Sequence, residues 1–142
     1  MAPPLININD IRLTFGGNDL FSDVSFAIGD RDRLCLVGRN GGGKSTLLKI
    51  IAGEIEADGG ERFVQPGCKI AYLNQEPKFD GFATVEEYVL SALDEHEIDY
   101  AYRVYMLLDS VNIDPQADPT KLSGGEGRRA AIARALIADP QV

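Results

Sequence analysis

The chain has 142 residues, 44% of them hydrophobic, and carries 14 Lys and Arg against 22 Asp and Glu, for a formal net charge of −8. The acidic balance argues against nonspecific binding to nucleic-acid phosphates. No apolar run approaches the roughly 18 residues of a membrane span, and the N-terminal sequence MAPP lacks the basic and apolar regions of a secretory signal. We therefore expect a cytoplasmic globular protein with no direct membrane insertion.

The first 30 residues predict an antiparallel β-hairpin. Residues 5–14 alternate apolar and polar side chains, and residues 23–28 do the same. The segment 15–19 between them, FGGND, has the composition of a turn. Two strands joined by a glycine-rich turn are typical of a hairpin.

The pattern then changes to one typical of a strand followed by a helix. Residues 34–37, LCLV, form a short continuous apolar run that predicts a strand buried on both faces. A glycine-rich loop follows at 38–43, and the apolar stripe of residues 45–52 predicts a helix.

Helices dominate the second half of the predicted chain. A Thr-x-x-Glu capping box at Thr84 and Glu87 opens one of them. Strand, glycine-rich loop, helix, strand and helices in this order predict an α/β fold. The chain ends at Val142, where such a unit would continue into its next strand, so we expect an incomplete domain. The predicted segments are turns at 58–67, a strand at 69–73, helices at 84–97 and 100–108, a loop at 112–120, and a helix at 124–138.

Residues 38–45, GRNGGGKS, match the pattern G-x-x-x-x-G-K-[ST] of a phosphate-binding loop, or P-loop. Glycines allow positive φ and turn successive backbone N–H groups toward an anion. The helix that follows directs its N-terminal dipole at the same point. Lys44 supplies a positive charge for the β- and γ-phosphates, and the Ser45 hydroxyl is a ligand for Mg²⁺. The motif therefore predicts a nucleotide-phosphate site.

The second motif is LSGGE at residues 122–126. Ser123 and Glu126 form a capping box for the last predicted helix, and the two glycines permit a tight turn into it. By itself this segment has a purely structural explanation. Downstream of a P-loop, the functional interpretation is favoured.

Together, GRNGGGKST and LSGGE resemble the P-loop and signature sequences of the ATP-binding cassette (ABC) ATPases, and the resemblance runs through all 142 residues. It implies ATP and Mg²⁺ as cofactors, with Gln75 as the glutamine that helps to coordinate Mg²⁺ and senses the γ-phosphate. It also implies that Phe15 stacks on adenine, although a buried aromatic at a hairpin end is an alternative explanation for this residue. The residues implied in ATP binding are Phe15, Gly38, Arg39, Asn40, Gly41, Gly42, Gly43, Lys44, Ser45 and Thr46.

The resemblance implies an ABC ATPase-type P-loop NTPase architecture. Its β part at residues 1–75 would carry the P-loop and Gln75, and its helical subdomain at 76–138 would carry the signature. It also implies a partner, because two cassettes of this family pair head to tail. The signature of one cassette then faces the γ-phosphate bound by the other. The residues implied to act across such a dimer are Leu122, Ser123, Gly124, Gly125 and Glu126.

Three parts of the family pattern are missing from these 142 residues: the Walker B aspartate, the catalytic glutamate and the switch histidine. His96 falls too early and in the helical part. Loss of a general base or of a charge-stabilising group lowers a rate by about 10²–10⁴-fold. No catalytic set is complete, so we expect this chain alone not to hydrolyse ATP at a useful rate.

Three stretches narrow the resemblance further. LCLVGRN, AYLNQEP and LSGGEGRR resemble the ABC-F subfamily, especially its Uup-like branch. Proteins of this subfamily are twin cassettes that act on the ribosome, as translation factors, or in nucleic-acid maintenance. Two alternatives stay open: the nucleotide-binding subunit of an ABC transporter, and a non-catalytic nucleotide-binding fragment.

Overall fold

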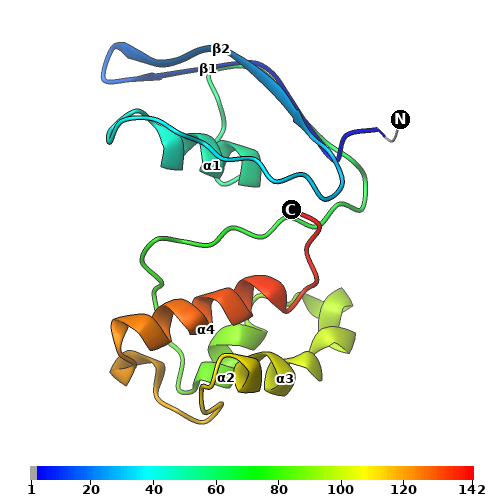
Figure 1. The fold of residues 1–142 in the computed structure, drawn as a ribbon, viewed down its shortest axis with the longest axis vertical. Helices are drawn as coiled ribbons and strands as arrows, with labels where there is room; N and C mark the ends of the chain where they lie inside the picture. The colour runs from blue at the N-terminus through cyan, green and yellow to red at the C-terminus, as the bar shows by residue number, and fades with distance from the viewer. Residues whose placement is uncertain (1–2) are drawn as a thin grey trace. The chain divides into compact units, whose positions relative to one another are not determined.

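The computed structural model describes residues 3–142, and the chain divides into two compact units (Figure 1). Unit 1 runs to Ile70 and includes Gln141 and Val142, whereas unit 2 consists of Ala71–Pro140. Each unit has a hydrophobic core of its own. Among the described residues, no helix is both long enough and apolar enough to cross a bilayer.

Unit 1 is a three-stranded antiparallel sheet packed on one helix. β1 (Ile6–Phe15) and β2 (Asn18–Ile28) form a hairpin, and β3 (Gly59–Val64) pairs with the other edge of β1. α1 (Lys44–Ala52) lies against one face of this sheet (Figure 1). The sheet therefore backs the helix that the P-loop opens.

Alternating residues of β1 supply much of the core of unit 1. Ile6 and Ile8 are fully buried, and Ile11 and Leu13 continue the buried row. The alternation of buried and exposed residues shifts by one position at Asp10. This residue has a φ of 49° and lies where the pairing with β2 is irregular. An extra residue in a strand moves the following side chains to the other face, so the irregularity keeps the row pointing inward. The residues that α1 adds to this core are Leu47, Ile50 and Ile51.

Unit 2 is helical, and α4 packs against both α2 and α3 (Figure 1). Ala130 and Ala133 of α4 are buried, so small side chains let the neighbouring helices approach closely. Val89 and Leu108 fill the core between them and are fully buried. The elements are α2 (Val85–Leu90), the 3₁₀ helix η1 (Glu95–Tyr100), α3 (Arg103–Ser110), the 3₁₀ helix η2 (Pro119–Lys121) and α4 (Gly124–Leu136).

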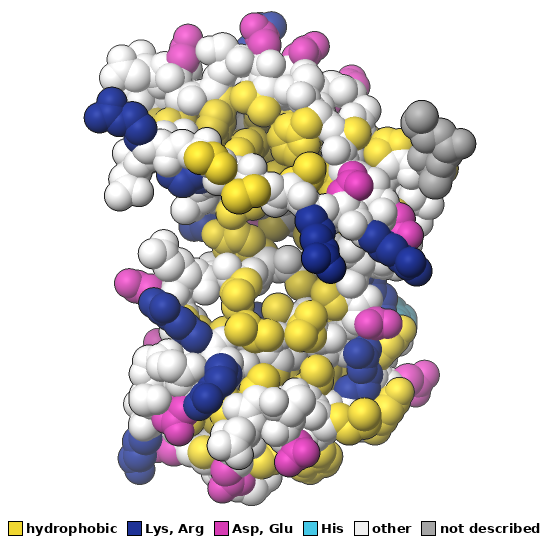
Figure 2. Space-filling view, in the orientation of Figure 1, with side chains coloured by type: hydrophobic (Ala, Val, Ile, Leu, Met, Phe, Trp, Pro, Cys, Tyr) yellow, Lys and Arg dark blue, Asp and Glu magenta, His cyan; other side chains and the backbone are white. Residues whose placement is uncertain are grey.

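The predicted hairpin is confirmed, with β2 beginning earlier than expected, but the strands predicted at 34–37 and 69–73 are wrong. A strand buried on both faces needs hydrogen-bonded neighbours. No strand among the described residues is paired with either segment. Leu34 and Val37 are consequently 61% and 86% exposed. Figure 2 shows further hydrophobic side chains at the surface of both units.

Of the turns predicted at 58–67, the one beginning at Gln65 is present, closed by the Cys68 N–H bond to the Gln65 carbonyl at 3.0 Å, whereas residues 59–64 form the strand β3. Its two initial glycines and its charged residues conceal the strand in the sequence. A long-range contact fixes its start: the Asp58 carboxylate accepts hydrogen bonds from the N–H and the hydroxyl of Thr14, at 2.7 and 2.6 Å. These bonds hold the pKa of Asp58 below its ordinary value. Tertiary pairing with β1 therefore decides this strand.

The four predicted helices are found in the predicted order among the described residues, with corrections to their bounds and two additional 3₁₀ helices. The helix predicted at 84–97 ends at Leu90, and the chain restarts as η1. Asp94 causes the restart, because it forms a capping box with Glu97 and satisfies the new N–H groups locally. The helix predicted at 100–108 is α3, displaced by a few residues; that predicted at 124–138 is α4. η2 begins at the end of the predicted loop 112–120.

Candidate nucleotide-binding site

The glycine-rich loop before α1 has the backbone conformation of an anion nest. Gly41 and Gly43 have φ values of +79° and +84°, a region that residues with a Cβ rarely adopt. Between them, the N–H of Gly42 donates to the carbonyl of Arg39 at 3.0 Å and closes a turn. Successive N–H groups in such a conformation line a concave surface that receives an anion.

The same loop ends at the N-terminus of α1. Gly43 is the N-cap and no side chain caps this end of the helix. The first helical bond joins the Leu47 N–H to the Gly43 carbonyl at 2.9 Å. N–H groups of the first turn have no intrahelical acceptor, and the helix dipole adds positive potential there. Ser45 is exposed and Thr46 is half-buried, so two hydroxyl groups are also present in this turn.

Lys44 folds back over the loop. Its Nζ donates to the carbonyl oxygens of Gly38 and Arg39, both at 2.8 Å. An ammonium group has three donors and no acceptor, and it forms stronger hydrogen bonds with anionic oxygens than with neutral ones. A phosphate oxygen at the loop would therefore compete favourably for these donors.

The loop rests on the start of β2. A Cβ built on Gly43 would lie 2.7 Å from Cζ of Phe21 and 2.9 Å from Cγ of Leu20. Neither of these two residues belongs to a motif in the sequence. Both are apolar and are therefore candidates for the core, but nothing in the sequence places either of them beside the P-loop.

Phe15 ends β1 beside the β1–β2 turn, and its side chain is 77% exposed. The alternative explanation, a buried aromatic at a hairpin end, is therefore wrong. Leu20 and Phe21 follow that turn and contact Gly43, so the turn and the P-loop lie at the same end of unit 1 (Figure 1). An exposed ring at this end has a free face for stacking.

The LSGGE segment forms the N-terminus of α4 in unit 2. The predicted capping box is confirmed: the Glu126 N–H donates to Ser123 Oγ at 3.3 Å, and the Ser123 N–H donates to Glu126 Oε2 at 2.8 Å. These bonds lower the pKa of Glu126. No heavy atom lies within 4 Å of a Cβ built on Gly124 or Gly125, so the first turn is open on that side. Leu122 packs against the core of unit 2.

Ser123→Ala is expected to lower the free energy of unfolding of unit 2 by about 1 kcal/mol, because N-cap serines typically contribute that much. Urea unfolding followed by far-UV circular dichroism measures the change. Ser22→Ala, at an exposed position of β2, is the control and should leave the transition in place. Equal effects of the two substitutions would contradict the capping assignment.

Gln75 is exposed and belongs to unit 2, in the segment that leads to α2. A cavity of about 300 Å³ opens beside this segment. Arg134 and Tyr88 both line this cavity. The Arg134 guanidinium lies 5.4 Å from the ring centre of Tyr88 and donates a hydrogen bond to Ser91 Oγ at 3.1 Å. Residues lining the cavity include Tyr72, Asn74, Glu76, Phe82, Tyr88 and Arg134.

The structure thus groups the predicted site residues in two sets. Unit 1 holds Phe15 and the whole loop 38–46, and unit 2 holds Gln75 and the signature segment 122–126. The sequence placed the boundary of the β part at residue 75, whereas the first unit ends at Ile70.

The loop has glycines in the left-handed region, leads directly into a helix that packs on a sheet, and has a lysine hydrogen-bonded to the loop carbonyls. These features together define a P-loop nucleotide-binding domain. The family described as ABC transporter matches residues 21–142, and the chain belongs to this family. The resemblance derived from the two motifs is therefore confirmed, and so is the ABC ATPase-type α/β fold.

Relatives of two kinds match the chain. It is 45% identical over 140 residues to ATP-binding protein Uup of Caulobacter vibrioides, covering 98% of this chain and 22% of that protein. It is 32% identical over 144 residues to zinc import ATP-binding protein ZnuC of Yersinia pestis, covering 100% of this chain and 56% of the relative. The chain spans less than a quarter of the Uup relatives, at 22% and 24% of their lengths.

Solved structures agree with this assignment. The ATP-binding subunit of an ABC transporter superposes with a TM-score of 0.82 at 25% identity, over 96% of this chain and 63% of that one. An ATP-binding cassette of another ABC transporter gives a TM-score of 0.74 at 20% identity, over 98% of this chain and 67% of that one. This second likeness supports the fold alone.

Proposed function

We propose that the chain binds ATP with Mg²⁺ as part of an ABC-F-type cassette. The observation that carries the proposal is the loop 38–45, in which two left-handed glycines, an uncapped helix N-terminus and the Lys44 ammonium converge. Each of these features favours an anion, and together they suit a chain of phosphates.

In this proposal different residues of unit 1 bind different parts of the nucleotide. The backbone of residues 38–46 and Lys44 hold the phosphates, and the exposed ring of Phe15 stacks on adenine. The described part of the chain contains no group of three His, Cys, Asp or Glu side chains suited to a metal. In this proposal Mg²⁺ binds with the nucleotide, held by phosphate oxygens and Ser45 Oγ, and neutralises phosphate charge.

The signature segment 122–126 would act on ATP held by a second cassette, either in the same polypeptide or in a dimer. Its open first turn, with no atom near the two glycines, supports this role because an anion has access to the helix N-terminus there.

The ABC-F assignment rests on the 45% identity with Uup. Under this proposal the protein acts in the cytoplasm, on the ribosome or in nucleic-acid maintenance. With a net charge of −8, the chain itself offers nucleic acid little attraction. Contacts with RNA or DNA would come from parts of the relatives that this chain does not span.

Equilibrium titration of the chain with ATP, ADP and AMP in the presence of Mg²⁺ tests the proposal. Affinity should fall in that order, because each lost phosphate removes charge-assisted contacts with the loop. Equal affinity for AMP and ATP, or no binding of either, would overturn it. ATP turnover measured in the same samples tests the expectation that this chain binds without hydrolysing.

Phe15→Ala is expected to weaken ATP binding by about fivefold or more, since aromatic stacking on a base is worth about 1–3 kcal/mol. Binding of inorganic tripolyphosphate, which has no base, should not change. Calorimetric titration of both ligands measures the difference. Phe63→Ala removes a ring that is 53% exposed on β3 and serves as the control. A parallel loss of tripolyphosphate affinity would rule out stacking as the role of Phe15.

A second candidate is the nucleotide-binding subunit of an ABC transporter. The match to ZnuC favours it, as does 34% identity over 150 residues to aliphatic sulfonates import ATP-binding protein SsuB of Bacillus cereus. Such a subunit would co-purify with a membrane protein after detergent extraction. An ABC-F protein would instead sediment with ribosomes or remain free.

A further inference from the structure

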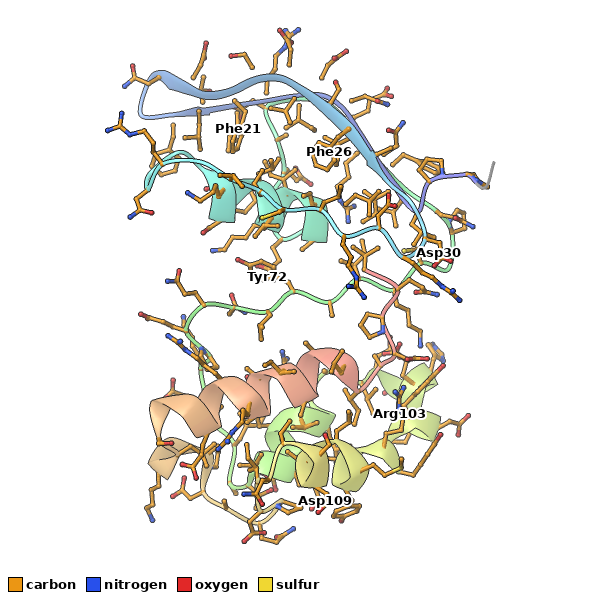
Figure 3. All side chains as sticks on the ribbon, in the orientation of Figure 1. Phe21, Phe26, Asp30, Tyr72, Arg103 and Asp109 are labelled. Atoms are coloured by element: carbon orange, nitrogen blue, oxygen red, sulfur yellow. The ribbon has the colours of Figure 1, made fainter. Side chains whose placement is uncertain are left out.

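The aromatic ring of Phe21 lies against Gly43, the last glycine of the P-loop. Phe21 pairs with Leu13 across the β1–β2 ladder and is half-buried. Figure 3 shows its side chain pointing from β2 toward α1. The backbone of Gly43 lies so close to the ring that an added Cβ would be 2.7 Å from Cζ and 3.0 Å from Cε1. Ring and glycine are therefore in direct contact.

The rest of the loop has little support from the core. Residues 38–42 are all exposed. Of the four loop glycines, Gly43 alone has a β2 side chain within 4 Å of an added Cβ, among the residues described. The Gly43 carbonyl also accepts the first hydrogen bond of α1. A shift of Gly43 would consequently move the N–H groups that surround it and the Lys44 backbone.

Phe26 provides a natural comparison on the same strand. It is half-buried like Phe21, packs against the same core and points toward α1 (Figure 3). It pairs with Ile8 at the other end of β2, and no P-loop glycine has it within 4 Å of an added Cβ. The two phenylalanines thus lie on the same strand and are both half-buried, but only Phe21 contacts a glycine of the loop.

We infer that Phe21 is a positioning residue for nucleotide binding: its ring fixes Gly43, and through Gly43 the N–H groups of the P-loop, in the arrangement that receives phosphate. The inference rests on the proposed binding of ATP to this loop. Donors that are already placed before a ligand arrives bind it more tightly, because no ordering cost is left for the binding step. Leu20, whose Cγ would lie 2.9 Å from the same added Cβ of Gly43, assists in this contact.

The test compares Phe21→Ala, Phe21→Leu and Phe26→Ala in the same chain. Both alanine variants should lower the thermal midpoint to a similar extent. Phe21→Ala alone should weaken ATP and tripolyphosphate binding, by about three- to tenfold, the equivalent of one well-placed hydrogen bond. Phe21→Leu, which retains bulk beneath Gly43, should recover most of the affinity. Equal affinity losses in Phe21→Ala and Phe26→Ala, or none in either, overturn the inference.

Amide hydrogen exchange without any nucleotide gives a second readout, which separates this inference from the proposed function. Exchange at residues 41–47 should accelerate in Phe21→Ala and stay at the wild-type rate in Phe26→Ala. If the wild-type chain binds no ATP, the proposed function fails while this comparison still tests the support of the loop. Unchanged exchange in Phe21→Ala overturns the positioning role. Should Phe21→Ala fail to fold, Phe21→Val, which removes more bulk beneath Gly43 than leucine does, is measured against Phe26→Val instead.

Discussion

Lys44→Ala is expected to weaken ATP binding by about 10- to 150-fold, since hydrogen bonds to charged groups contribute about 1.5–3 kcal/mol. The Lys44 ammonium lies within the loop, 2.8 Å from two of its carbonyl oxygens, and is therefore already placed for phosphate. The loss should be largest for ATP and smallest for AMP, because the charge acts on the outer phosphates. Calorimetric titration with the three nucleotides measures it.

Lys49→Ala provides the control for charge. Lys49 lies in the last turn of the same helix, at the end opposite the loop, and its removal changes the net charge of the chain equally. It should leave ATP affinity within about twofold, because the half-buried Lys49 lies at the end of the helix opposite the loop. If Lys49→Ala and Lys44→Ala have equal effects, binding depends on overall charge and the P-loop assignment is wrong. Thermal midpoints of both variants establish that the fold is retained.

Leu108→Ala is expected to destabilise unit 2 by about 2–5 kcal/mol, the usual cost of truncating a buried leucine. Leu108 is fully buried in the core that α2, α3 and α4 share. A loss of this size is a large fraction of the stability of a unit of this length. Urea unfolding should show the helical signal disappearing at lower denaturant concentration, or a chain without a cooperative transition.

Met106→Ala is the matched control for Leu108→Ala, because it truncates a side chain of the same helix that is 69% exposed. Surface substitutions usually change stability by no more than about 0.5 kcal/mol. ATP affinity of the two variants can also be compared with that of the wild-type chain, since the loop and its supporting strands belong to unit 1 and the substitutions to unit 2. An equal effect of both truncations would show that the core of unit 2 has been wrongly identified.

The features that the sequence predicted correctly are those whose interactions are local. The loop 38–45 requires glycines at the left-handed positions Gly41 and Gly43, and it opens a helix directly. The capping boxes at Asp94 and Ser123 close within four residues; the second was predicted, and the first was overlooked because the helical pattern continues past it. The hairpin of β1 and β2 needs only a short turn. Neighbours along the chain are sufficient to specify all of these.

Tertiary structure decided everything that depends on distant partners. An apolar run such as 34–37 forms a strand only where other strands supply hydrogen bonds, and none of the described strands does so. The polar segment Gly59–Val64 becomes β3 because β1 and the Asp58–Thr14 bonds hold it in place. The exposure of Phe15, and the contact of Phe21 with Gly43 across residues far apart in the chain, also follow from packing. The sequence by itself therefore determined the family and the glycine-rich loop of the proposed phosphate site, whereas only the fold showed that Phe21 and Leu20 lie against Gly43 of that loop.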